Sequence, residues 1–397
     1  MAKITIFVFI VALIIRLTLA TLPGMVIDMS AWFAWAVRLN EFGFSKFYSD
    51  EVWTNYLPGY LYILAFLGAF KNFFSITDYN FYYLLKMPAI IADLILAFLV
   101  FKLLGKKKLA LFAAIVVLFN PAFLFNSSIW GQIDSILTLF LFLSIYYLNS
   151  KRLTLSSIFI ALAILIKPQA IALVPVYCFY LLKYPSLRHF LQLTLSSIAV
   201  IFFLSLPFFP SEPILGIWKL FFRMVEDYQF ISLYAYNFWG MIGFWINDST
   251  IWQGISYKHW GYILLIFYWL IIFYSYFKRK FFFFSLSTLA FLSFFFLPTR
   301  VHERYLYPAL IFLIIFAIQI KNKWLILLYF ILSLIHFLNL YYVYIYYNEF
   351  YLSLPKVLYI PFLYFFAQDY SKILSLLSTV IFYLVTIIII KEVYAKK

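Results

Sequence analysis

The stretch LTLSSIFIALAILIKPQAIALVPVYCFYLL, residues 153–182, decides the fold. It carries one charge, Lys167, which stands in the string Lys167-Pro168-Gln169 near the middle. Each half is nearly as long as a helix that crosses about 30 Å of hydrocarbon. Pro168 suits the first position of the second helix, because its missing N–H donor costs nothing there. The stretch therefore predicts two successive membrane helices that meet at a polar string.

The composition extends this interpretation to all 397 residues. Hydrophobic residues make up 66% of the chain, charged residues make up 11%, and the mean hydropathy is +0.98. Globular domains are roughly half apolar and a quarter charged, so the composition excludes a soluble domain. The single cysteine, Cys178, excludes an intrachain disulfide and a cysteine-based metal site.

Twelve apolar runs of membrane-helix length, or nearly so, predict about twelve crossings, within a range of eleven to thirteen. They begin near residues 4, 87, 109, 135, 153, 169, 190, 260, 281, 306, 324 and 372. We therefore expect one all-α polytopic membrane domain over residues 1–397, with no separate extracytoplasmic domain.

The basic residues orient these crossings. If the N-terminus lies inside, seventeen of the thirty Lys and Arg face the cytoplasm, including every dense basic cluster. The clusters are at residues 102–108, 151–152, 183–188, 278–280 and 321–323 and in the tail from 391. Thirteen of the fifteen acids then lie outside, and both termini are cytoplasmic. Topology in the cell membrane thus explains the net charge of +15 better than nucleic-acid binding does.

Three outer segments are too long for simple turns, and we expect them to hold the function. They are residues 23–86, 209–259 and 346–371. Residues 57–70 within the first are apolar but short and contain Pro58 and Gly59, which predicts an interfacial or re-entrant segment. Nine of the eleven tryptophans fall in or beside the long segments. They form either an aromatic belt at the membrane interface or a sugar site, because pyranose C–H faces stack on indole.

Two outer acids are candidates for chemistry. Asp28 directly follows the first run, and Trp32, Trp35 and Arg38 continue at helical spacing, which predicts an interfacial amphipathic helix. The Asp28 carboxylate is placed to accept a proton from an acceptor hydroxyl, although Asp is also favoured as a helix N-cap.

The second acid, Asp134, closes an outer turn that reads Trp130-Gly131-Gln132-Ile133-Asp134. A polar cluster at this depth is costly and needs a reason. Asp134 either takes part in the site or caps the helix that begins at Ser135.

Cations at the same face suit a phosphate. Lys167 is either an anchor that snorkels to the interface or a group that holds a lipid phosphate. The string 298–305, PTRVHERY, supplies two guanidiniums and an imidazole for a phosphate or pyrophosphate. Its alternative role is an exposed salt bridge of Glu303 with Arg300 or Arg304. Lys86 either serves the same site or pairs with Asp93, seven residues further along.

These motifs resemble the GT-C superfamily of polyprenyl-phosphate-sugar-dependent (dolichyl-phosphate-type) glycosyltransferases, in particular its mannosyltransferase-like members. The resemblance covers most of the chain and rests on four features in the family's order. They are Asp28, the turn from Trp130 to Asp134, the Lys167-Pro168-Gln169 string, and His302-Glu303-Arg304-Tyr305. The family often has two adjacent acids in the first loop, whereas Met29 follows Asp28 here, which makes a metal-dependent variant less expected.

The resemblance implies that Asp28 is the catalytic base and that the enzyme is an inverting hexosyltransferase without cofactor or metal. Lys167, His302, Arg304 and Lys86 would bind the donor phosphate. The acceptor or the sugar would contact Asp134, Gln132, Trp130, Gln169, Glu303 and Tyr305. The partners expected are a polyprenyl-phosphate-linked sugar, membrane lipids, and a glycan, lipid or protein acceptor, with the active site facing outside. The rival interpretations are a lipid or sugar transporter or flippase, which needs polar groups near the membrane midplane, and a non-catalytic scaffold of the same fold.

Overall fold

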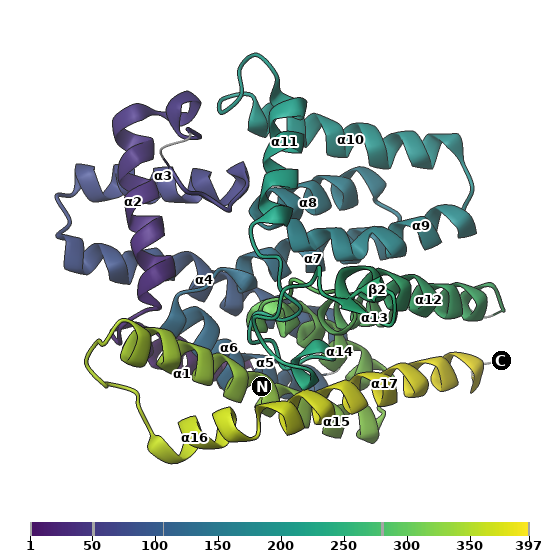
Figure 1. Cartoon of the computed structure of the whole chain (residues 1–397). Coiled ribbons are helices and arrows are strands. Elements are labelled where there is room, and N and C mark those ends of the chain that lie inside the picture. The colour runs from purple at the N-terminus through teal and green to yellow at the C-terminus, as the bar shows by residue number, and fades with distance from the viewer. Residues whose placement is uncertain (1, 50–51, 106, 279–281, 396–397) are drawn as a thin grey trace.

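The computed structural model describes residues 2–49, 52–105, 107–278 and 282–395, and its architecture is almost entirely helical (Figure 1). The first half contains α1 (Ala2–Ala20), α2 (Val26–Phe42), η1 (Phe44–Lys46), α3 (Pro58–Phe73), α4 (Asp78–Leu104), α5 (Lys107–Leu118), α6 (Pro121–Leu124), η2 (Phe125–Trp130), α7 (Asp134–Asn149), α8 (Leu153–Ile166), η3 (Pro168–Leu173), α9 (Val174–Lys183) and α10 (Leu187–Ser205). The second half contains α11 (Pro213–Glu226), η4 (Trp239–Met241), β1 (Ile251–Trp252), β2 (Ile255–Ser256), α12 (Tyr257–Lys278), α13 (Phe283–Phe296), η5 (Glu303–Leu306), α14 (Tyr307–Gln319), α15 (Lys323–Ile345), η6 (Tyr346–Tyr351), α16 (Pro361–Asp369) and α17 (Ser371–Ala395).

A helix lies in each of the twelve apolar runs. Six described helices are long and apolar enough to cross a membrane: 3–20, 78–104, 187–205, 257–276, 323–351 and 371–394. A seventh results if 108–118 and 121–130, which bend by 45° at a short break, form one span. Four more apolar helices are shorter: 134–149, 153–166, 168–183 and 283–296. These helices are those of a multi-pass, all-α membrane protein.

The long outer segments contain helices, as expected. Helices α2 and α11 run across the direction of α8 and α10, which pack side by side (Figure 1). The apolar segment expected over 57–70 is α3, a helix that packs on α2 and α8. One boundary differs from the expectation, because α4 begins at Asp78, ahead of the apolar run. Thr77 caps it there by accepting a hydrogen bond from the Asn80 N–H, so the end of the 23–86 segment is already helical.

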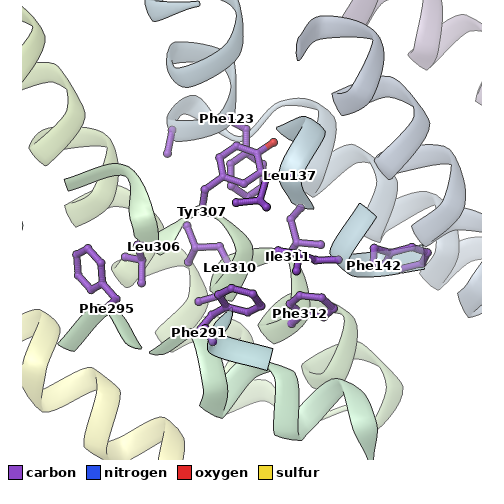
Figure 2. Close-up of a cluster of buried hydrophobic side chains, with 14 of the residues drawn as sticks. Phe123, Leu137, Phe142, Phe291, Phe295, Leu306, Tyr307, Leu310, Ile311 and Phe312 are labelled. Atoms are coloured by element: carbon purple, nitrogen blue, oxygen red, sulfur yellow. The ribbon is translucent and has the colours of Figure 1, made fainter. Parts of the chain in front are cut away.

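The hydrophobic core is built around α14. All of its residues from Tyr307 to Ile318 are buried, as expected for a helix that is apolar on every side. Figure 2 shows the side chains of α14 in contact with those of α6, α7 and α13, and Phe291 stacks on Phe312 with 5.8 Å between ring centroids. Helix α14 thus packs against α7 and η5, which carry polar groups of the site described below.

A buried polar network joins α1, α4, η2 and α14. The Asp93 carboxylate pairs with Arg16 at 3.4 Å and accepts hydrogen bonds from the Ser127 hydroxyl at 2.6 Å and from the Tyr307 hydroxyl. Arg16 also donates to the Leu118 carbonyl at 2.7 Å. Asp93 therefore does not pair with Lys86, which corrects that alternative, and Arg16 is neutralised inside the helix bundle.

Of the basic clusters used to orient the crossings, Lys106, Arg279, Lys280, Lys396 and Lys397 lie outside the described residues. The membrane orientation stays a prediction.

Candidate functional site

Asp28 is placed by a contact between two loops that are far apart in the sequence. The backbone N–H of Met25 donates to the Trp130 carbonyl at 3.0 Å, which ties the start of α2 to the turn after η2. A Cβ on Gly24 would lie 2.7 Å from Met29 Cγ and 3.1 Å from the Trp130 carbonyl oxygen, so glycine permits this approach. The Asn348 side chain binds the same segment through two hydrogen bonds. It donates to the Gly24 carbonyl at 2.9 Å and accepts from the Val26 N–H at 3.1 Å.

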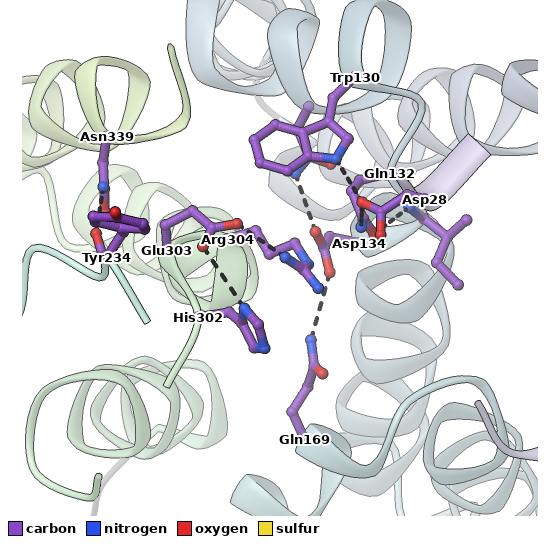
Figure 3. A network of polar contacts seen from close by, with 12 residues as sticks. Asp28, Trp130, Gln132, Asp134, Gln169, Tyr234, His302, Glu303, Arg304 and Asn339 are labelled. Atoms are coloured by element: carbon purple, nitrogen blue, oxygen red, sulfur yellow. Dashed lines mark hydrogen bonds and ion pairs between the residues drawn. The ribbon is translucent and has the colours of Figure 1, made fainter. Parts of the chain in front are cut away.

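The Asp28 carboxylate faces two neutral donors. Its Oδ2 accepts a hydrogen bond from Trp130 Nε1 and another from Gln132 Nε2, each 2.7 Å long (Figure 3). Among the described residues, Oδ1 has no hydrogen bond and no cation forms an ion pair with Asp28. The N-cap of α2 is Met25 rather than Asp28, so the capping alternative is wrong.

The turn that supplies these donors depends on Gly131. Its φ is +91°, in the left-handed region, where it ends the π-helix η2. A Cβ at this position would lie 2.6 Å from Met29 Sδ. Glycine therefore permits both the reversal of the chain and the close contact with α2, and Trp130 and Gln132 face Asp28 as a result.

Asp134 and Lys167 form a buried ion pair of 2.6 Å. Lys167 Nζ also donates to Gln132 Oε1 at 2.9 Å. The side-chain amide of Gln132 thus links Lys167 to Asp28, to which its Nε2 donates. Asn126 donates to the second oxygen of Asp134 at 3.0 Å, and Gln169 approaches the first at 3.4 Å. Asp134 is the first residue of α7 but makes no side-chain cap, so this second capping alternative is also wrong.

The basic string of residues 298–305 divides into two parts. Arg304 pairs with Glu303 at 2.9 Å, and His302 Nδ1 lies 3.8 Å from the other carboxylate oxygen (Figure 3). Glu303 is only 2% exposed, so the expected exposed salt bridge is in fact buried. Arg300 has a positive φ of 65° and pairs with Asp248 at 2.7 Å, away from Glu303.

The charges in the string perturb one another. Burial raises the pKa of Glu303, but the adjacent Arg304 and His302 outweigh burial and lower it to about 2. Burial and the Arg304 charge lower the pKa of His302, so its imidazole is neutral at neutral pH. Burial disfavours the charged form of Arg304, but Glu303 and Asp28 raise its pKa overall. Arg304 Nε is buried and has no hydrogen-bond partner among the described residues.

Lys167, Gln169, His302, Arg304 and Tyr305 line one pocket of about 260 Å³. Its remaining lining includes the aromatic and apolar side chains Ile171, Phe221, Met224, Val225, Tyr262 and Phe294. The lining of the pocket thus combines the cations Lys167, Arg300 and Arg304 with apolar and aromatic side chains, some of them from α11. Burial lowers the pKa of Lys167, and the Asp134 carboxylate opposes that shift.

Two site residues were missed from the sequence, Tyr56 and Tyr60. Their hydroxyls are buried without a hydrogen-bond partner in the described parts of the chain. Burial and then the Asp28 charge raise the pKa of Tyr56, whose ring lies 5.9 Å from Lys167 Nζ. A Cβ on Gly59 would lie 2.6 Å from the Leu165 carbonyl carbon, so glycine brings α3 against the end of α8. The sequence Asn55-Tyr56-Leu57-Pro58-Gly59-Tyr60, in which two tyrosines flank a Pro-Gly pair, was the signal that could have identified them.

Lys86 is not brought together with the other cations. Its Nζ donates to the carbonyls of Ala20 and Leu22 at 3.0 and 2.6 Å, and it lines a second pocket. All other residues expected from the sequence lie in the network of Asp28, in the pocket, or next to both.

Within the described ranges, no group of three or more His, Cys, Asp or Glu side chains is arranged to hold a metal ion. No protein-family model matches the chain, and no curated protein matches it significantly.

Proposed function

We propose that the protein is a membrane glycosyltransferase of the GT-C type. It would transfer a hexose, mannose or a similar sugar, from a polyprenyl-phosphate donor to an acceptor hydroxyl at the extracytoplasmic face. The observation that carries the proposal is the Asp28 carboxylate, held by Trp130 and Gln132 beside a pocket lined by Lys167 and Arg304.

Asp28 suits the role of general base. The two neutral donors fix its Oδ2 without neutralising its charge, and its Oδ1 is left to accept a proton. The other two acids of the network are less suited, because Asp134 is paired with Lys167 and Glu303 with Arg304. General-base catalysis requires a positioned acceptor within hydrogen-bond reach of the proton.

Arg304, Lys167 and His302 suit the donor phosphate. The Nε–H of Arg304 has no hydrogen-bond partner among the described residues, and a guanidinium binds phosphate oxygens through paired donors. Lys167 uses two of its three donors within the protein. His302 is neutral and would donate to the phosphate through Nε2–H, since its Nδ1 faces Glu303. These donors would stabilise the charge that grows on the leaving phosphate.

The reaction is a single displacement. The acceptor oxygen forms a bond to the anomeric carbon as the bond from that carbon to the phosphate oxygen breaks. The bonding pair leaves with the polyprenyl phosphate, and the acceptor's proton goes to Asp28. One displacement inverts the configuration at the anomeric carbon, and the phosphate needs no protonation to leave.

The pocket also has apolar side chains in its lining, which supports a lipid-linked donor. Phe221, Met224 and Val225 of α11 line it together with Phe294. Trp218 and Phe222 on the same helix are largely exposed, as expected for a helix that lies at the membrane interface. The start of the isoprenoid chain would follow the apolar side chains of the pocket into the bilayer.

The proposal includes the full topology predicted from the sequence. About twelve crossings, cytoplasmic termini and an outer active site follow from the apolar runs and the basic clusters. The short helices 134–149, 153–166, 168–183 and 283–296 would be crossings that begin or end at the polar site.

A donor panel tests the proposal. The wild-type protein is reconstituted in liposomes with radiolabelled polyprenyl-phosphate mannose, glucose and arabinose, together with a membrane extract as acceptor. The proposal predicts that one donor is consumed and that its anomeric configuration is inverted in the product. If no donor is bound or consumed, a transport or scaffold function replaces the transferase.

A further inference from the structure

A second pocket, of about 610 Å³, lies between the end of α1, the start of α2 and the start of α4. Its lining includes Leu22, Pro23 and Gly24 from the first connection, Met29 and Ser30 from α2, and Tyr79, Tyr82, Tyr83 and Lys86 from α4. The lining is mostly apolar and aromatic, with Lys86 as its only ionisable side chain apart from the tyrosines.

Lys86 is 2% exposed, and its hydrogen bonds explain part of its position. Its ammonium donates to the carbonyls of Ala20, the last residue of α1, and of Leu22, two residues further along. Carbonyls at a helix C-terminus have no partner within the helix. A cation at a helix C-terminus is favoured by the helix dipole. An ammonium has three donors, so one donor remains that no described residue uses.

No carboxylate of the described residues forms an ion pair with Lys86. Lys167 provides the contrast, since that buried lysine is neutralised by Asp134 at 2.6 Å. A buried charge without a counter-charge is costly. An anion from outside the protein would supply the counter-charge that the Lys86 ammonium lacks among the described residues.

The rim of the pocket indicates where the anion comes from. Tyr79 is 80% exposed and Tyr82 is 37% exposed, and both stand on the first turns of α4. Tyrosines at the end of a membrane helix mark the level of the lipid headgroups. A lysine just inside that level meets lipid phosphates, and apolar lining below it meets acyl chains.

We propose that this pocket binds one anionic phospholipid, with the headgroup phosphate at Lys86 and an acyl chain against the apolar lining. The site is separate from the donor pocket, because the two pockets share no lining residue. The proposal does not depend on the glycosyltransferase activity. The bound lipid would hold the segment from Ala20 to Ser30, which carries Asp28.

Native mass spectrometry tests the site. The purified full-length protein is incubated with vesicles of phosphatidylcholine, or of phosphatidylcholine with phosphatidylglycerol, and retained lipid is counted after detergent extraction. We expect one phosphatidylglycerol per chain. It should be preferred about fivefold over phosphatidylcholine, because this is the gain in affinity that one lysine provides towards anionic lipid. Equal retention of the two lipids would overturn the proposal, and so would displacement of phosphatidylglycerol by millimolar inorganic phosphate, since that would indicate a site for free phosphate.

Three variants separate the site from folding. Lys86→Met should lose the preference for phosphatidylglycerol, but it also removes two hydrogen bonds at the end of α1. Ser30→Phe keeps Lys86 and fills the pocket from an exposed position on α2. It should lose the bound lipid, while its thermal unfolding temperature in lipid-free detergent stays at the wild-type value. Lys356→Met, at an exposed lysine outside the pocket, should retain lipid like the wild type. Wild-type lipid retention by Ser30→Phe would show that the lipid binds elsewhere.

Discussion

The indole Nε1 of Trp130 donates a 2.7 Å hydrogen bond to Oδ2 of Asp28, across 102 residues of sequence. This bond joins the first outer segment to the turn before α7. Together with the bond from Gln132, it sets the direction in which the free Oδ1 points. The proposed base is therefore positioned by another loop rather than by its own helix.

Removing that donor tests whether Asp28 must be held in place. Trp130→Phe keeps an aromatic ring and loses the N–H. A hydrogen bond to a charged group contributes about 1.5–3 kcal/mol, so turnover should fall by roughly one to two orders of magnitude. The KM for the donor should stay close to the wild-type value, because the indole does not line the donor pocket. A rise in KM with unchanged kcat would mean that Trp130 contacts the donor instead.

Tyr56→Phe separates a functional hydroxyl from a structural one. The Tyr56 hydroxyl is buried without a partner in the described residues, so its removal should leave the unfolding temperature unchanged or raise it. If the hydroxyl contacts the donor, turnover should fall about tenfold, which corresponds to one lost hydrogen bond. Tyr177→Phe is the matched control, because the Tyr177 hydroxyl bonds to Ser156 at 2.7 Å. The control should lose stability, and an equal loss from Tyr56→Phe would contradict the assignment.

The Lys167–Asp134 pair should show strong coupling in stability. Lys167→Met leaves the fully buried Asp134 without a counter-charge, and breaking one side of a buried pair costs about 3–5 kcal/mol. The double variant Lys167→Met with Asp134→Leu removes both charges and should recover most of that loss. Unfolding in detergent, monitored by thermal shift, measures all three variants. Additive effects of the two substitutions would show that the side chains do not interact.

The lowered pKa of Glu303 predicts that the folded protein loses stability in acid. Burial raises its pKa, but Arg304 and His302 lower it to about 2, below its ordinary value of 4.5. A group with a lowered folded-state pKa stabilises the protein above its unfolded pKa, and this contribution is lost as the pH falls. We therefore expect stability to decrease as the pH falls from about 4.5 towards 2. Glu303→Gln should flatten this part of the profile, whereas Glu212→Gln, at a surface ion pair, should not.

The sequence predicted which residues gather but not how they contact. Charge topology predicted that Asp28, Asp134, Lys167 and the 302–305 string share one membrane face. The structure brings these residues close together, while the membrane face itself stays a prediction. That Gln132 bridges Asp28 and Lys167 was not predictable, because the bridge depends on the left-handed turn at Gly131.

Three other features depended on contacts between segments that are distant in the sequence. Lys86 and Asp93 lie about two turns apart on the same face of α4, and they meet different parts of α1, its C-terminal end and Arg16. Arg300 and Arg304 diverge because the chain turns at Arg300, which precedes the short helix η5 that carries Arg304. Tyr56 was missed because its burial results from the contact of Gly59 with Leu165, more than a hundred residues away.

The most direct test of the central claim compares Asp28→Asn with Asp78→Asn in liposomes, using the donor that the wild type consumes. Asp78 is the matched control, because it is 71% exposed and pairs only with Lys71 at the surface. Our account predicts that Asp28→Asn binds the donor like the wild type but consumes it at least about a hundredfold more slowly, the contribution of a general base, while Asp78→Asn is unaffected. Undiminished turnover by a correctly folded Asp28→Asn protein would contradict the account.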